Sequence, residues 1–149
     1  MPAAEELGRR FGRPAFGAFT TDDLDTAFDL FMRGVCGERY RSVLEQRLGE
    51  NAVDEAIRQS AFFFRDEAPA VLESTFGAAD GARIHFPVLV AEGADGGAAA
   101  LLAQQITALA TRLLPHAEVA RVAGTNHMMP LQDPEAVARL IHDFAGRHS

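Results

Sequence analysis

Two side chains that could take part in acid–base catalysis follow two short apolar runs in the second half of the sequence. Asp95 lies in a glycine-rich loop directly after the run 87–91. His127 lies in the loop directly after the run 117–122. If the two runs are neighbouring strands of a parallel sheet, about 4.8 Å apart, the carboxylate and the imidazole leave the same edge and could come within hydrogen-bond reach. A carboxylate that holds one ring nitrogen leaves the other free to act as a general base.

The pattern of residues 85–149 predicts the elements that would position this pair. The run 87–91 is continuous and apolar, which is typical of a strand covered on both faces in a parallel sheet. Residues 98–114 repeat leucine or isoleucine at helical spacing and predict a helix that ends at Pro115. Residues 117–122 then predict a second strand. A helical crossover between two strands makes them parallel.

Capping residues and helical spacing predict helices in most of the remaining chain. Asp133 is expected to cap a last helix, with Pro134 at its first position. Residues 21–84 are predicted to be helical throughout. Their expected helices begin after Thr20 or Thr21 with Asp23 in a capping box, and then cover about 39–48, 51–65 and 69–74. In residues 1–20, Gly8, Gly12, Pro14 and Gly17 interrupt the segment and no period is visible, so an irregular segment is predicted there.

Composition excludes several classes of function. The formal charge of −7 argues against nucleic acids and anionic membranes as partners. All 14 basic residues are arginines, so a P-loop and Schiff-base chemistry are excluded, since both need lysine. Cys36 is the only cysteine, which excludes an internal disulfide and a cysteine-based zinc site. We expect no cofactor and no metal. The start of the chain has no apolar signal region, so we expect a cytoplasmic protein.

The C-terminal sequence resembles the α/β-hydrolase family. The matching residues are Pro87-Val88-Leu89-Val90 with Gly93 and Asp95, then Leu114-Pro115-His116-Ala117-Glu118, then Gly124-Thr125-Asn126-His127-Met128, and finally Asp133-Pro134-Glu135 with a closing helix through Phe144. The resemblance implies an α/β fold in which residues 21–84 form a helical cap-like region. It also implies that residues 85–149 form the last β-α-β-α part of a parallel hydrolase sheet, so that the fold is incomplete.

The same resemblance assigns the two candidate catalytic residues. His127 corresponds to the family's catalytic histidine, the general base. Asp95 corresponds to its acid, although members most often carry the acid where this chain has Gly96, and others carry it after an earlier strand. The family's nucleophile lies in a strand–G-x-S-x-G–helix elbow, and no serine of this chain has that context. Cys36 lies in half of such a motif but is expected to be a buried apolar residue.

Three interpretations follow from the missing nucleophile. In the first, the chain is the C-terminal portion of an ester-hydrolysing enzyme, inactive alone and acting on a small ester-like substrate once an N-terminal half completes it. In the second, it is a non-catalytic assembly module that self-associates or pairs through the exposed edge of its apolar strand. In the third, the sequence is truncated, and the elbow is encoded upstream of Met1.

Overall fold

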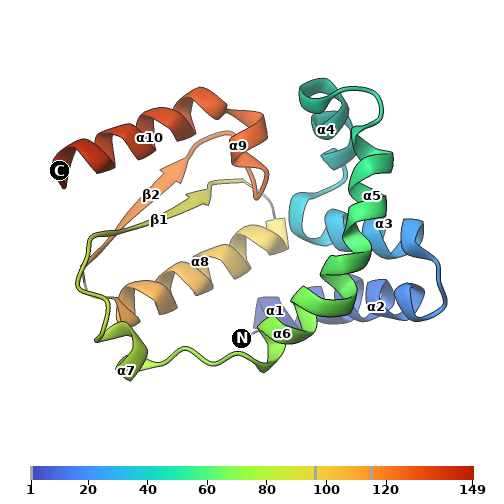
Figure 1. The fold of residues 1–149 in the computed structure, drawn as a ribbon, viewed down its shortest axis with the longest axis horizontal. Coiled ribbons are helices and arrows are strands. Elements are labelled where there is room, and N and C mark those ends of the chain that lie inside the picture. Colours follow the sequence, from blue (N-terminus) through green and yellow to red (C-terminus); the bar gives the residue numbers. More distant parts are fainter. Residues whose placement is uncertain (1, 96, 115) are drawn as a thin grey trace. The chain divides into compact units, whose positions relative to one another are not determined.

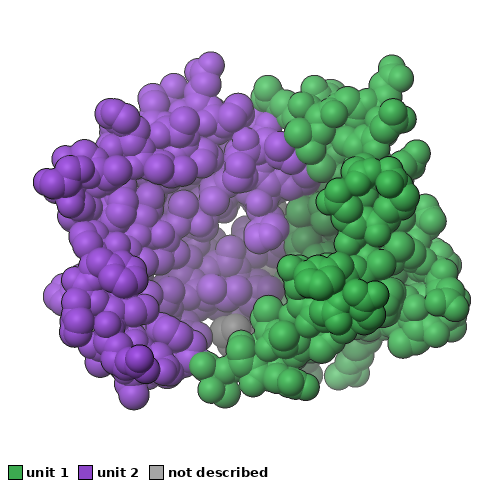
Figure 2. Space-filling model, in the orientation of Figure 1, with its two compact units in different colours: residues 1–75 green, residues 76–149 purple. Residues whose placement is uncertain are grey.

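The computed structural model describes residues 2–95, 97–114 and 116–149. The chain divides into two compact units, residues 1–75 and residues 76–149, which we call unit 1 and unit 2 (Figure 2). Each unit has its own internal contacts and is described by itself.

The boundary between the units lies before the short helix α7 (Ala78–Gly81), whereas the sequence predicted it after residue 84. A Cβ atom on Gly81 would lie 2.2 Å from the carbonyl oxygen of Leu113, the last residue of α8 (Gly97–Leu113). Only glycine permits two backbones to approach this closely. The contact fixes α7 to α8 and therefore to unit 2.

Unit 1 consists of helices joined by short turns (Figure 1). In chain order these are α1 (Pro2–Leu7), the π-helical turn η1 (Gly8–Gly12), α2 (Arg13–Thr20), α3 (Leu24–Cys36), α4 (Tyr40–Leu48), α5 (Ala52–Phe62), the π-helical turn η2 (Phe63–Glu67) and α6 (Ala68–Glu73). The helices α4 and α5 lie where the sequence predicted helices. The expected short helix near 69–74 is α6, which continues from α5 through η2 without a break.

Residues 2–20 are helical, so the prediction of an irregular N-terminal segment is wrong. Pro14 lies in the first turn of α2, where the missing N–H of proline removes no helical hydrogen bond. Phe11 packs so tightly on α3 that a Cβ atom on Gly34 would lie 2.8 Å from the Phe11 Cβ. Ala15 is completely buried. Packing against the rest of unit 1 therefore outweighs the low helix propensity of the glycines.

Asp23 caps the N-terminus of α3 through its own side chain. Its Oδ1 accepts a hydrogen bond from the N–H of Thr26 at 3.1 Å. The sequence predicted a capping box led by Thr20, but the Thr20 hydroxyl donates to the Gly17 carbonyl at 2.7 Å and so closes the end of α2. The predicted helix is present, and its cap is a different residue.

An aromatic cluster around Phe64 forms the core of unit 1. Phe64 is 2% exposed, and the rings of Phe16, Phe19, Phe31 and Phe63 surround it with centroid distances of 5.2–5.9 Å. Edge-on and offset arrangements at this distance are favourable beyond the area they bury. Phe64 is therefore the centre of this core, whereas Phe62, two residues before it, is 54% exposed.

Unit 2 contains a parallel two-stranded sheet with helices on both sides. β1 (Val88–Gly93) pairs in parallel with β2 (Ala117–Val122) along the full length of both strands. α8 connects the strands, and the short α9 (Met129–Gln132) leads into α10 (Pro134–Arg147). α8 and α10 lie on opposite sides of the sheet (Figure 1). The predicted parallel strands are confirmed, and the chain combines many helices with a small α/β element.

The sheet is covered less completely than its apolar sequence predicted. Side chains 88–91 are half-buried, although a strand covered on both faces was expected. On α8, Thr107 is buried, whereas Ile106 is 51% exposed. On α10, Ile141 is 57% exposed. Two helices against two strands leave apolar surface of unit 2 in contact with solvent.

Candidate functional site

Asp95 and His127 lie in the loops that leave the carboxyl ends of the two paired strands. Asp95 follows β1 and His127 follows β2. Both side chains are exposed. The sheet therefore brings the two predicted residues to the same edge, as parallel pairing requires.

Backbone hydrogen bonds join the two loops directly. The N–H of Ala94 donates to the Val122 carbonyl at 3.1 Å, and the N–H of Asp95 donates to the Thr125 carbonyl at 2.8 Å. Gly93 lies against the loop that carries His127, since a Cβ atom on Gly93 would be 2.3 Å from the carbonyl oxygen of Asn126. The segment that carries Asp95 is thus fixed to the segment that carries His127.

The residues on either side of His127 are buried or hydrogen-bonded, while its imidazole faces solvent. Thr125 is 3% exposed, and its hydroxyl donates to the Val122 carbonyl at 2.8 Å. Met128 is 6% exposed and therefore packs inside the unit. The Oδ1 of Asn126 accepts the N–H of Met128 at 2.9 Å, which closes a turn around His127. The loop therefore presents the imidazole from a fixed backbone.

No hydrogen bond joins the side chains of Asp95 and His127 within the part of the chain that the structure describes. Their backbones are neighbours, and the orientation of the imidazole by the carboxylate stays a prediction. The alternative acid position at Gly96 and the predicted helix end at Pro115 lie outside the described residues. Hydrogen bonds of catalytic groups often form fully only when substrate is bound, so an open geometry is compatible with the predicted pair.

Glu92 is a second carboxylate at this end of the sheet, one residue beyond the apolar run 87–91. It lies in β1 and is 5% exposed. Its Oε2 accepts the Thr107 hydroxyl at 2.6 Å, and its Oε1 pairs with the guanidinium of Arg121, which lies opposite it on β2. Both oxygens are occupied, so Glu92 stabilises the sheet and is not available as a base. Its signal in the sequence is the shared register of the glutamate and the arginine, each fifth in its strand.

Cys36 is not available as a nucleophile. The thiol is buried at 4% exposure, and burial raises its pKa to about 12. It is therefore protonated at neutral pH, and the thiolate is the reactive form. The expectation of a buried apolar cysteine is confirmed.

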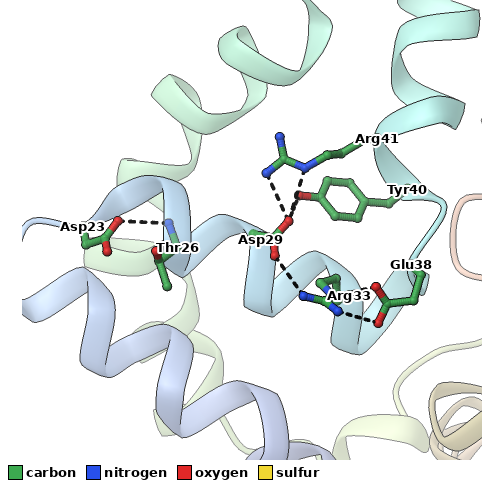
Figure 3. A network of polar contacts seen from close by, with 7 residues as sticks. All are labelled: Asp23, Thr26, Asp29, Arg33, Glu38, Tyr40 and Arg41. Atoms are coloured by element: carbon green, nitrogen blue, oxygen red, sulfur yellow. Dashed lines mark hydrogen bonds and ion pairs between the residues drawn. The ribbon is translucent and has the colours of Figure 1, made fainter.

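A network of charged residues in unit 1 centres on Asp29 (Figure 3). Asp29 Oδ1 accepts the Tyr40 hydroxyl at 2.7 Å and two N–H groups of Arg41 at 3.0 and 3.2 Å. Burial works to raise the pKa of Asp29, but these donors outweigh it and the pKa lies below its ordinary value. Burial and the bond to Asp29 raise the pKa of Tyr40. The network ties α3 to α4 and leaves no reactive group at neutral pH.

A shallow hollow in unit 1 does not form a substrate site. Its lining residues are Arg58, Gln59, Ala61, Phe62, Phe63, Arg65 and Glu67. All of them belong to the continuous helical stretch of α5 and η2. One helix cannot enclose a ligand, since a binding pocket is concave and buries most of the molecule it holds. Arg58 and Arg65 also pair with Glu55 and Asp66, respectively.

No protein-family model, curated protein or solved structure matches this chain. Among the described residues there is no group of three or more His, Cys, Asp or Glu side chains that could hold a metal ion. None of the described helices is long and apolar enough to cross a membrane. The two loops of unit 2 that carry Asp95 and His127 are therefore the candidate functional region of this chain.

Proposed function

We propose that this chain supplies the general-base part of an α/β-hydrolase-like site for ester hydrolysis, with His127 as the base and Asp95 as the acid that orients it. The observation that carries the proposal is the backbone connection between the two loops. The Asp95 N–H is bonded to the Thr125 carbonyl, two residues before His127, at the carboxyl ends of parallel strands. The exposed imidazole on this edge can take a proton from a nucleophile or from water.

The nucleophile and the oxyanion-binding groups would come from an N-terminal half that completes the sheet. The sequence contains no G-x-S-x-G elbow, and the thiol of Cys36 is buried and protonated. The small-molecule ester-like substrate would bind only in the completed site. Unit 1 would then act as the helical cap. The chain alone is expected to be inactive.

Complementation tests this proposal. The chain is mixed with an N-terminal α/β-hydrolase half that carries the nucleophile elbow, and hydrolysis of p-nitrophenyl butyrate is measured. We expect turnover in the mixture only, reduced about 10²-fold or more by His127→Ala, as for loss of a general base. His142→Ala, on the exposed side of α10, is the matched control and should leave turnover unchanged. Turnover that survives His127→Ala contradicts the assignment of the base.

A second candidate function is a non-catalytic assembly module, and the incomplete cover of the sheet favours it. The described part of unit 2 has two strands, and Leu101, Ile106 and Val119 are 55%, 51% and 45% exposed. Apolar surface and open strand edges favour association with another chain, including a second copy of this one. Sedimentation velocity over a range of concentrations tests this function. A dimer weakened by Ile106→Asp, but not by Val71→Asp in unit 1, supports it, and a monomer at all concentrations contradicts self-association.

A further inference from the structure

Gln132 is a half-buried polar side chain that the sequence analysis did not single out. It is the last residue of α9. Its Oε1 accepts a hydrogen bond from the backbone N–H of Asn126 at 2.8 Å. The bond therefore reaches back across the loop to the residue that precedes His127.

Asn126 connects this bond to the whole turn around His127. Its Oδ1 accepts the N–H of Met128 at 2.9 Å, and its carbonyl accepts the N–H of Met129 at 3.0 Å. The same carbonyl lies directly against Gly93 in β1. Because the N–H of Asn126 is held by Gln132, the backbone on both sides of His127 is fixed through one residue.

The helix that follows does not need Gln132. Asp133 caps α10 with its own carboxylate, which accepts the N–H of Ala136 at 2.9 Å. The backbone N–H of Gln132 donates to the Met128 carbonyl at 3.0 Å, a bond that any residue at this position can make. The glutamine side chain supplies the acceptor for the N–H of Asn126. Its specific contribution is thus to the loop of His127.

We propose that Gln132 is a positioning residue for His127, acting through the N–H of Asn126. The inference rests on the proposed function of His127 as a base and adds a residue to it. The proposed role uses the acceptor oxygen of the Gln132 side chain. A glutamate can supply that oxygen, and a methionine of similar length cannot.

The test compares Gln132→Met and Gln132→Glu with the wild-type chain by NMR. Two quantities are measured: hydrogen exchange of the Asn126 amide and the backbone order parameters of residues 125–129. In the wild type we expect order parameters near those of rigid backbone, about 0.85. Gln132→Met should accelerate exchange of the Asn126 amide about tenfold, the effect of one lost hydrogen bond, and should lower the order around His127. Gln132→Glu should retain both wild-type values.

A matched control is Gln104→Met on the exposed side of α8, which should change neither quantity. A general loss of stability would accelerate exchange throughout unit 2. The proposed positioning role instead predicts a change confined to residues 125–129. Unchanged exchange and order in Gln132→Met overturn the inference, as does a glutamate variant that behaves like the methionine variant. If Gln132→Met does not fold, the wild-type chain and Gln132→Glu provide the test. Wild-type order parameters below about 0.6 at Asn126 and Met128 overturn the inference. Wild-type values near about 0.85 that are retained in Gln132→Glu support it. None of these measurements uses ester hydrolysis, so failed complementation with the expected loop behaviour refutes the hydrolytic proposal and leaves the positioning of the loop in place.

Discussion

Unit 1 and unit 2 are each stabilised internally by a different kind of contact. In unit 1, large side chains such as Phe64 and Tyr40 are 2% and 1% exposed, and aromatic rings surround Phe64. In unit 2, the buried apolar side chains among the described residues are Val122 and Met128. Instead, unit 2 relies on close backbone contacts at Gly81 and Gly93 and on hydrogen bonds between loops. The candidate chemistry lies in the unit with the sparser core.

This difference explains what keeps the candidate site in shape. Apolar burial is proportional to area and does not specify direction, whereas hydrogen bonds and close backbone contacts fix particular atoms. Because the imidazole of His127 is exposed, the conformation of its loop depends on hydrogen bonds and close backbone contacts more than on apolar burial. Changes in unit 1 should therefore affect stability, and changes in the loops of unit 2 should affect local order.

Removal of the central ring of unit 1 should have the largest effect on stability. Phe64→Ala leaves a cavity among four other phenylalanine rings and should lower the free energy of unfolding by about 3–5 kcal/mol. Phe62→Ala, at an exposed neighbouring position, should cost less than about 1 kcal/mol. Tyr40 is the only tyrosine and the chain has no tryptophan, so urea unfolding followed by Tyr40 fluorescence reports on unit 1. Equal losses for the two variants would show that Phe64 is not the centre of the core.

A methyl group at Gly93 should have the next largest effect, confined mainly to unit 2. Its Cβ would lie 2.3 Å from the Asn126 carbonyl oxygen, so the two loops must separate, at a cost of about 1–3 kcal/mol. Hydrogen exchange of the Asp95 amide, which is bonded to the Thr125 carbonyl, should accelerate. The urea midpoint of unit 1, measured by Tyr40 fluorescence, should change little. Gly146→Ala, with open space around its Cβ position in α10, is the control. Retained protection at Asp95 would contradict the close approach of the loops.

The smallest effect is the pH dependence of unit 1. The pKa of Asp29 is lowered in the folded chain, so its stabilising contribution is complete above its ordinary value of 3.8 and is lost as the pH falls through the lower folded value. The pKa of Tyr40 is raised, so its contribution is present below its ordinary value of 10.0 and is lost as the pH rises above it. Urea midpoints measured from pH 2 to 11 should fall at both ends. Asp29→Asn should remove the dependence at the acid end, and an unchanged acid dependence would refute its assignment to Asp29.

The sequence predicted the parts of the fold that local patterns determine. The apolar runs predicted β1 and β2, the intervening helix made them parallel, and the cap at Asp133 was placed correctly. The helical residues 2–20 were missed because glycine and proline suggest irregular structure, while the contact between Phe11 and Gly34 depends on the tertiary fold. Three consecutive phenylalanines could not reveal which ring is buried, because the π-helical turn η2 changes the helical period there.

The candidate site was predictable to a similar degree. Strand ends placed Asp95 and His127 on one edge, since the order of elements alone determines the edge. The bond from Gln132 to Asn126 was not predictable, because it joins side chain to backbone across a turn whose shape the sequence does not specify. The burial of Glu92 was not predictable either, because a glutamate is rarely buried unless it is paired, and its partner Arg121 lies far along the chain.

The central claim is that Asp95 acts on the imidazole of His127, and the ring nitrogens of His127 report on this directly. Long-range ¹H–¹⁵N spectra at fixed pH show how the protons are distributed over the two nitrogens of each histidine. We predict that Asp95→Asn changes this distribution at His127, whereas Asp143→Asn, beside His142 on α10, leaves His127 unchanged. A His127 spectrum that is identical in the wild type and in Asp95→Asn would contradict the proposed pair.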